Sequence, residues 1–283
     1  MVGLVFTFTL RVSNTAGEAT ATTARQDVPD DPSDNTRSAC ERSLHKRTSA
    51  VLAWLERQGS AGAREGMARY AIRSEKIFGV SVSRLRAHAK RLGRDHDLAA
   101  ALWGTGWHEA RMLAAFVEDP DQVTPAQMDR WCRDFDNWAV CDTVCLHLFT
   151  RTPHAWRKVA LWSGRRDEFV RRAAFSLLAA LAVRDKQSAD APFLMGLSLI
   201  ESAADDERNF VRKAVNWALR AIGRRNADLK AAAVEAAQRL AGSPRAATRW
   251  VGRDALKALT GPVAARQPVG TRQNAPRRSR TAI

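Results

Sequence analysis

Phe169-Val-Arg-Arg-Ala-Ala-Phe-Ser-Leu-Leu-Ala-Ala-Leu181 and Phe210-Val-Arg-Lys-Ala-Val-Asn-Trp-Ala-Leu-Arg-Ala-Ile222 are the stretches that decide the fold. The second aligns with the first at a shift of 41 residues without a gap, and residues 250–259 align with the second at a further shift of 40. A repeat of about 40 residues is typical of HEAT or armadillo-like solenoids, whose units are pairs of helices. Each pair leaves an apolar face that only its neighbours can cover, so the units are expected to stack.

The rest of the chain fits the same architecture. Apolar residues recur at helical spacing throughout residues 43–260, and alternating strand patterns are nearly absent. We therefore predict an all-α, HEAT-like helical repeat solenoid with a concave basic cleft over residues 43–260. Residues 1–42 are rich in Thr, Ser and Asp and are expected to form a disordered extension. Residues 261–283 carry five Arg and no acid, which predicts a flexible basic tail.

The charge of the chain points to a polyanionic partner. Of its 283 residues, 45 are Lys or Arg and 30 are Asp or Glu, which gives a net charge of +15, while 45% hydrophobic content suffices for a packed core. The repeat alignment places Arg172, Lys213 and Arg253 at equivalent positions, where a basic column would match the periodic charge of a nucleic-acid backbone. A solvated helix surface and a GC-rich genome are the alternative explanations.

Compartment and cofactors are predicted from what the sequence does not contain. No apolar run approaches the length of a membrane-spanning helix, and residues 1–10 lack the basic start of a secretory signal. The cysteines form no CxxC pair, so buried reduced thiols are expected rather than a zinc site: Cys40, Cys132, Cys141 and Cys145. We predict a cytoplasmic monomer with no metal, no cofactor, no membrane association and no obligate protein partner.

Trp138 and Asp142 form the one pairing that suggests catalysis. They are four residues apart, so on a helix they share a face. A carboxylate beside an indole in a basic groove suits the stabilisation of a cation formed from DNA. On spacing alone, a core tryptophan and a surface aspartate are the simpler interpretation. Trp217 replaces Ser176 of the preceding repeat, so it either fills a wider gap in the core or lines the cleft.

Several ordered motifs between about Gly66 and Ile222 resemble the AlkD-type DNA alkylation repair family, the HEAT-like repeat DNA glycosylases. The N-terminal half of the resemblance is carried by five motifs: Met67-Ala-Arg-Tyr-Ala-Ile-Arg73, Phe78-Gly-Val-Ser-Val-Ser-Arg-Leu-Arg86, Leu102-Trp103, Glu109-Ala-Arg-Met-Leu-Ala114 and the WxxxD motif at Trp138 and Asp142. The LxRAA helix of the family is similar to Val170-Arg-Arg-Ala-Ala174, and its FxxKAxxWxLR helix is similar to residues 210–220.

The resemblance implies hydrolysis of the N-glycosidic bond of N3- or N7-alkylated purines in duplex DNA. By position, Asp142 would stabilise the oxocarbenium-like transition state and position water. Trp138 and Trp217 would flank the lesion nucleotide, and Arg172 would hold the nearby phosphate. The remaining DNA contacts implied or expected are Tyr70, Arg171, Phe210, Lys213, Arg220 and Arg253.

Two departures from the family pattern leave open which arginine contacts the phosphate, with the gapless alignment favouring Arg172, and whether the cleft is altered. Arg171 and Arg172 double the family arginine, and the intervals from Asp142 to Arg172 and from Arg172 to Trp217 differ from the expected lengths.

Two other functions remain as alternatives to a glycosylase. The first alternative is a noncatalytic HEAT-like module that binds DNA or RNA junctions. The second is a protein-binding scaffold, which the basic core disfavours.

Overall fold

The computed structural model describes residues 32–72 and 74–261, and within these ranges all regular structure is helical. The helices are α1 (Pro32–Gln58), α2 (Ala61–Arg69), α3 (Val82–Leu92), α4 (His96–Gly104), α5 (His108–Val117), α6 (Pro125–Arg133), α7 (Trp138–His147), the 3-10 helix η1 (Phe149–Arg151), α8 (Ala155–Ser163), α9 (Glu168–Arg184), α10 (Ala191–Ala203), α11 (Asn209–Ile222), α12 (Ala227–Ala241) and α13 (Ala246–Thr260). The prediction of an all-α chain is confirmed for these residues. None of the described helices is long and apolar enough to span a membrane.

The chain divides into two compact units, Met1–Glu41 and Arg42–Ile283. Of the first unit, only the start of α1 is described, and it begins at Pro32, before the boundary predicted at residue 43. Proline is well placed there, because the first turn of a helix needs no backbone N–H donor. Residues 1–31 and the tail from residue 262 lie outside the described residues, as do the predictions of disorder that fall on them.

Local sequence explains where many of the helices begin. At five N-termini, a side-chain oxygen accepts a hydrogen bond from a backbone N–H of the first turn, which satisfies a donor that has no partner within the helix. These capping residues are Ser60, Asp95, Thr124, Asn137 and Asn226. Proline occupies the first turn of α6 and of α10.

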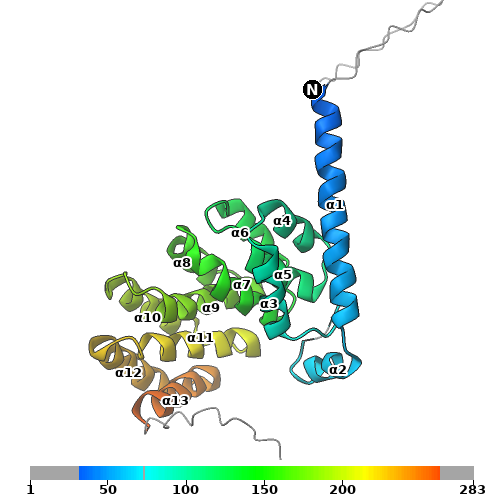
Figure 1. The fold of residues 1–283 in the computed structure, drawn as a ribbon. Coiled ribbons are helices and arrows are strands. Elements are labelled where there is room, and N and C mark those ends of the chain that lie inside the picture. The colour runs from blue at the N-terminus through cyan, green and yellow to red at the C-terminus, as the bar shows by residue number, and fades with distance from the viewer. Residues whose placement is uncertain (1–31, 73, 262–283) are drawn as a thin grey trace, which may run out of the picture. The chain divides into compact units, whose positions relative to one another are not determined.

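The repeats of the sequence form helix pairs that stack side by side. The three aligned stretches lie on α9, α11 and α13, and α11 contacts both of the others. Their partner helices α8, α10 and α12 form a second series, in which α10 contacts both α8 and α12 (Figure 1). Helices α5 and α7 continue the first series, because α5 contacts α7 and α7 contacts α9. The positions predicted to be equivalent therefore lie on neighbouring helices.

The cysteines differ in their environment. Cys132, Cys141 and Cys145 are buried free thiols, as predicted, and burial raises the pKa of Cys132 and of Cys145 above the usual range. Cys40 is exposed on α1, so the prediction of a buried thiol is wrong there. The residues within two positions of Cys40 in the chain are Ser38, Ala39, Glu41 and Arg42, and none of them has a large apolar side chain that could cover the thiol.

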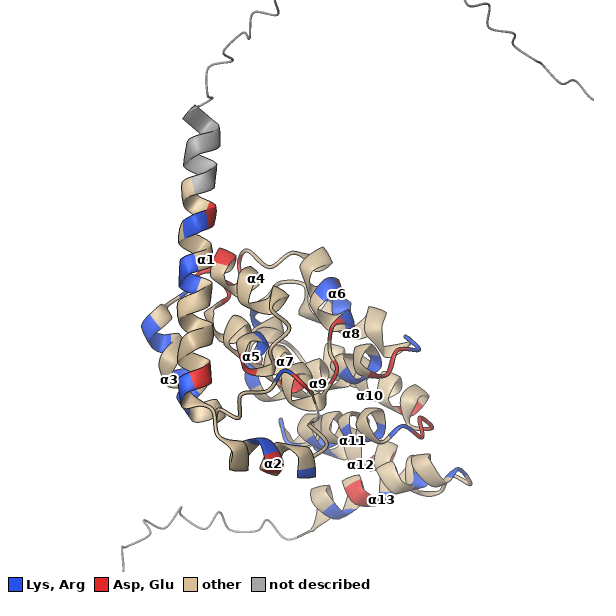
Figure 2. Ribbon diagram, turned by 90° about the vertical axis from the view of Figure 1, so that its right-hand side faces the viewer, with Lys and Arg blue, Asp and Glu red and all other residues tan. Residues whose placement is uncertain are grey.

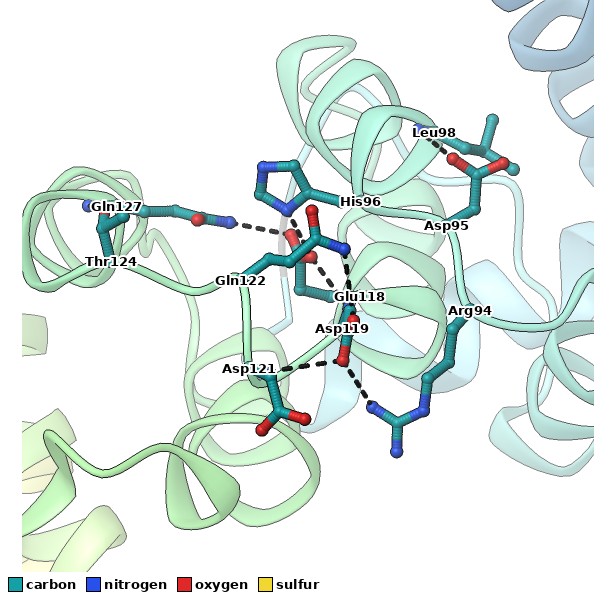
Figure 3. A network of polar contacts seen from close by, with 10 residues as sticks. All are labelled: Arg94, Asp95, His96, Leu98, Glu118, Asp119, Asp121, Gln122, Thr124 and Gln127. Atoms are coloured by element: carbon teal, nitrogen blue, oxygen red, sulfur yellow. Dashed lines mark hydrogen bonds and ion pairs between the residues drawn. The ribbon is translucent and has the colours of Figure 1, made fainter.

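Two buried glutamates connect elements that are distant in sequence. Glu118 accepts hydrogen bonds from Gln127 Nε2 at 2.7 Å and contacts His96 Nδ1 at 2.7 Å, which links α4, the end of α5 and α6 (Figure 3). Glu109, which is fully buried on α5, accepts hydrogen bonds from the backbone N–H groups of residues 78, 79 and 80 at 2.7–3.1 Å. A buried carboxylate requires such donors. Glu109 therefore fixes the loop before α3.

Gly79 in this loop has a backbone conformation that other residues rarely adopt. Its φ is +85°, and a Cβ atom placed on it would lie 2.4 Å from the carbonyl oxygen of Ser60. We expect Gly79→Ala to lower the free energy of unfolding by about 1–3 kcal/mol. Gly62→Ala is the matched control, because nothing lies within 4 Å of its added methyl group on α2. It is expected to be neutral or stabilising by up to about 1 kcal/mol. Urea unfolding checks both, and equal midpoints for the two variants would contradict the assignment.

Candidate active site

An open cavity of about 430 Å³ brings together the residues that the sequence singled out around Asp142. It is lined by the end of α2 and by residues of α7, α9 and α11. The lining residues are Arg69, Tyr70, Ala71, Trp138, Asp142, Arg172, Asn209, Phe210 and Lys213. Five of the predicted site residues thus meet Asp142 here although they are separated by up to some 140 positions in the sequence: Tyr70, Trp138, Arg172, Phe210 and Lys213.

The start of α7 positions Trp138 and Asp142. The side chain of Asn137 caps the helix by accepting hydrogen bonds from the N–H groups of Ala139 and Val140 at 3.0 and 3.1 Å. Trp138 is therefore the first residue of the helix, and Asp142 follows one turn later on the same face. The predicted spacing produces the expected juxtaposition in the cavity.

Tyr70 and Ala71 form part of the lining of the cavity next to Trp138. Trp138 donates a hydrogen bond from Nε1 to the carbonyl oxygen of Tyr70 at 2.8 Å, which fixes both the indole and this backbone. The tyrosine side chain is 72% exposed, and Ala71 adopts a φ of +58°, an unfavourable value for a residue with a side chain. Such backbone strain persists only where surrounding contacts impose it. Trp138 supplies one of those contacts.

Asp142 is held by two residues of the neighbouring helix α9. Arg172 donates from Nε to Oδ1 at 3.1 Å and from Nη2 to Oδ2 at 2.7 Å, and Ser176 donates from Oγ to Oδ1 at 2.7 Å. The two-point contact with the guanidinium fixes the plane of the carboxylate. The Asp142 side chain remains 20% exposed, whereas that of Arg172 is only 7% exposed. The carboxylate is thus the member of the pair that faces the cavity.

Arg172 stays charged in this environment. Burial acts to lower the pKa of Arg172, but the charge and hydrogen bonds of Asp142 outweigh burial and raise it above its usual value. Its Nη1 also donates to the carbonyl oxygen of Phe210 at 2.6 Å, so Arg172 links α7, α9 and α11. The sequence predicted a phosphate contact for this residue. In the structure, its described hydrogen bonds go to Asp142 and to the backbone.

The remaining predicted residues lie outside the lining of this cavity. Arg171 forms an ion pair with Asp206 at 3.0 Å. Trp217 is half-buried and packs against the core, and Arg220 donates from Nε to the Asn216 carbonyl of its own helix at 3.4 Å. Arg253 is exposed on α13 and lines a different cavity. The predicted basic column is therefore uneven, because Arg172 is buried while Lys213 and Arg253 are exposed.

Sequence reasoning missed Ser176, although the repeat alignment pointed to its position. That alignment pairs Ser176 with Trp217, and the tryptophan drew attention as the exceptional residue. The structure shows a specific contact at the serine instead: Ser176 is fully buried and its hydroxyl donates to Asp142. A serine within an otherwise apolar helical stretch is the pattern that indicates such a buried partner.

No group of three or more His, Cys, Asp or Glu side chains that could hold a metal ion is found among the described residues. The chemistry that this cavity offers from its own side chains is that of one oriented carboxylate between aromatic rings and a lysine.

Comparison with known families shows to which family the chain belongs. A family described as DNA alkylation repair enzyme matches residues 51–259. The chain belongs to this family. The resemblance seen in the sequence motifs is thereby confirmed. A search of curated proteins finds no match.

A solved structure supports the HEAT-like fold of this family member. It was described as "A new family of proteins related to the HEAT-like repeat DNA glycosylases with affinity for branched DNA structures". The TM-score is 0.61 at 22% sequence identity, over 67% of this chain and 81% of the other. The prediction of a HEAT-like repeat fold is confirmed.

The two adjacent arginines of α9 give a test of the site geometry. Arg172→Gln is expected to destabilise the protein by about 3–5 kcal/mol, because it leaves Asp142 without its cationic partner. Arg171→Gln is the matched control and should cost about 1 kcal/mol or less, because its partner Asp206 keeps its ion pair with Arg208. Denaturant unfolding measures both. Equal losses of stability would show that the Asp142–Arg172 pair does not hold the two helices as described.

Proposed function

We propose that this protein is a DNA glycosylase that hydrolyses the N-glycosidic bond of cationic N3- or N7-alkylated purines in duplex DNA. Membership of the DNA alkylation repair enzyme family supports the substrate class. The observation that carries the proposal is the oriented, partly exposed carboxylate of Asp142 in a cavity that also presents the indole of Trp138.

The chemistry requires little beyond this carboxylate. An alkylated purine carries a positive charge, so it leaves with the electron pair of the C1′–N bond and becomes neutral. The deoxyribose then develops the charge of an oxocarbenium ion, as in glycoside hydrolysis. A fixed negative charge beside the sugar stabilises this state, and the same carboxylate accepts a proton from the water that attacks C1′.

The hydrogen bonds of Asp142 indicate which of its two carboxylate oxygens accepts the proton from the attacking water. Oδ1 accepts from both Arg172 Nε and Ser176 Oγ, whereas Oδ2 accepts from Arg172 Nη2 alone. Each carboxylate oxygen can accept about two hydrogen bonds. Among the described contacts, Oδ2 therefore keeps a free acceptor site, and we assign the water to Oδ2. Arg172 and Ser176 hold the carboxylate in place so that it need not reorient during the reaction.

The walls of the cavity suit a nucleotide. Trp138, Phe210 and Tyr70 present aromatic rings, and the exposed Lys213 presents a positive charge. Aromatic faces attract a cationic base or sugar, and an ammonium group attracts a phosphate. We propose that Lys213, rather than the buried Arg172, makes the phosphate contact nearest to the reaction.

A noncatalytic DNA-binding module is the second candidate. It is favoured by the pairing of Asp142 with Arg172, because the guanidinium partly neutralises the charge that catalysis uses. The structural neighbour described above has affinity for branched DNA, which suits such a role. Both candidates bind DNA, so only the release of a base separates them.

The deciding experiment is the release of 7-methylguanine or 3-methyladenine from methylated duplex DNA under single-turnover conditions. Wild type should release base, and Asp142→Asn should be slower by about 10²–10³-fold, because it loses the charge and keeps the shape. Asp228→Asn, at an exposed position on α12, is the matched control and should retain the wild-type rate. DNA binding without base release by wild type would replace the enzyme with the binding module. Full activity of Asp142→Asn would refute the role of the carboxylate.

Binding to undamaged duplex should be strongly dependent on salt. For a protein that grips the backbone, log Kd rises with log salt concentration in proportion to the number of phosphates contacted. Lys213→Gln is expected to make this slope less steep by about one unit, because it removes one such contact. Fluorescence anisotropy across a range of salt concentrations measures the slope. An affinity independent of salt would contradict backbone recognition altogether.

A further inference from the structure

A second cavity, of about 410 Å³, lies at the opposite end of α7 from Trp138. It is lined by Arg86 and Lys90 of α3, by Arg94 and Phe116, and by His147, the last residue of α7. Arg184, at the end of α9, contacts His147 as well. In Figure 2, the ribbon of α3 carries basic residues, coloured blue. We name Arg86, Lys90, His147, Arg151 and Arg184 the His147 cluster.

The imidazole of His147 lies between two guanidinium groups. Its Nε2 is 2.6 Å from Nη2 of Arg86, and its Nδ1 is 3.5 Å from Nη2 of Arg184. A neutral imidazole can accept a hydrogen bond at only one nitrogen, and a guanidinium can only donate. With Nε2 accepting from Arg86, the proton on Nδ1 points towards another donor. A hydrogen-bond acceptor beside these two groups would satisfy both the Nδ1–H of His147 and Nη2 of Arg184.

The ring of Phe116 fixes this arrangement. The guanidinium carbon of Arg86 lies 5.7 Å from the centroid of the ring, and the imidazole of His147 meets the same ring edge-on at 5.1 Å between centroids. The ring thus contacts both the Arg86 guanidinium and the imidazole and holds them next to each other.

The His147 cluster has an excess of positive charge that its surroundings do not neutralise. None of its arginines or its lysine forms an ion pair with a described carboxylate. The nearby Asp119 is paired with Arg94, and Asp121 acts on Arg151 only at longer range. Burial, together with the charges of Arg86, Arg184 and Arg151, lowers the pKa of His147 to about 4. Burial and the charges of Arg94 and Arg184 lower the pKa of Arg151.

A partly exposed side of α7, which covers about half of the circumference of the helix, extends from the candidate active site to the His147 cluster. Trp138, Ala139, Asp142, Thr143, Leu146 and His147 are partly exposed, whereas the other residues of the helix are buried. Five positions separate Asp142 from His147, which is about 7.5 Å along the helix axis. Phosphates of one DNA strand follow one another about every 3.4 Å along the duplex axis. The rise between the two groups thus corresponds to about two nucleotide steps, and their side chains leave the helix about 140° apart around its axis.

We propose that the His147 cluster binds a backbone phosphodiester of the same DNA that occupies the Asp142 cavity. The phosphate oxygens accept hydrogen bonds from Arg184, from Arg86 and from the ring N–H of His147, which supplies the acceptor that these donors lack. This inference rests on the DNA-binding part of the proposed function and holds for a noncatalytic module as well. In this arrangement, α7 carries the carboxylate of Asp142, which faces the sugar, and at its C-terminal end the His147 cluster, which binds the DNA backbone.

The salt dependence of binding tests the proposal. The double variant Arg86→Gln/Arg184→Gln should weaken binding to undamaged duplex and make the slope of log Kd against log salt concentration less steep by about one unit. The matched control is Arg157→Gln/Arg224→Gln, which removes the same charge from exposed positions on α8 and after α11. Its slope should match that of wild type. Equal slopes for the two double variants would overturn the proposal, since the effect would then be one of net charge.

The titration of His147 followed by NMR distinguishes the source of the phosphate. A bound phosphodiester stabilises the protonated imidazole, so its pKa should rise from about 4 towards the usual range when duplex DNA is added. Inorganic phosphate at the same phosphate concentration should shift it far less. An equal shift with inorganic phosphate would make this a site for free anions, and no shift with DNA would remove the site. If the salt slopes and the His147 titration come out as expected and wild type releases no base, only the glycosylase activity is refuted and the phosphate site stands.

Discussion

The burial of α9 is the constraint on which the candidate site depends. This helix is covered by α7, α8 and α11, and nearly all of its side chains after the first turn are buried. Two of them, Arg172 and Ser176, are polar. A buried guanidinium without a partner costs several kcal/mol, and a buried hydroxyl without a partner costs about 1–3 kcal/mol. Both side chains therefore need an acceptor on a neighbouring helix. Both find Asp142, and packing thereby determines the position of the carboxylate.

The same contact relates stability to chemistry. The Asp142–Arg172 pair joins α7 to α9, and the bond of Arg172 to the Phe210 carbonyl extends the link to α11. The residues that support the cavity are therefore part of the contact between repeats. On α7, the partly exposed side carries an acid with fixed partners near the middle of the helix and an imidazole between two unpaired arginines at its end. Charge on this helix is therefore separated by position, with the negative group in the Asp142 cavity and the positive groups at the C-terminal end of the helix.

Much of the fold could be predicted from the sequence because repeats are local. A period of about 40 residues specifies a helix pair and its neighbours without any knowledge of distant contacts, and Trp138 and Asp142 meet because they share one helix. The partners of Asp142 could not be predicted in the same way. The family resemblance implies a phosphate contact for Arg172, and the charge of a residue in the sequence gives no measure of its burial. Ser176 was overlooked beside Trp217, because the alignment shows that two residues differ and not which of them faces a neighbouring carboxylate.

The sequence by itself determined the helical class, the period of the repeat, the family and the pair Trp138 and Asp142, since each depends on spacing within one stretch of chain. Only the tertiary structure decided which cations remain available. Arg172 and Arg171 are taken up by Asp142 and Asp206, whereas Lys213, Arg86 and Arg184 have no carboxylate partner among the described residues. The physical reason is that ion pairing falls steeply with distance and is strengthened by burial. Both quantities arise only when helices distant in sequence pack together.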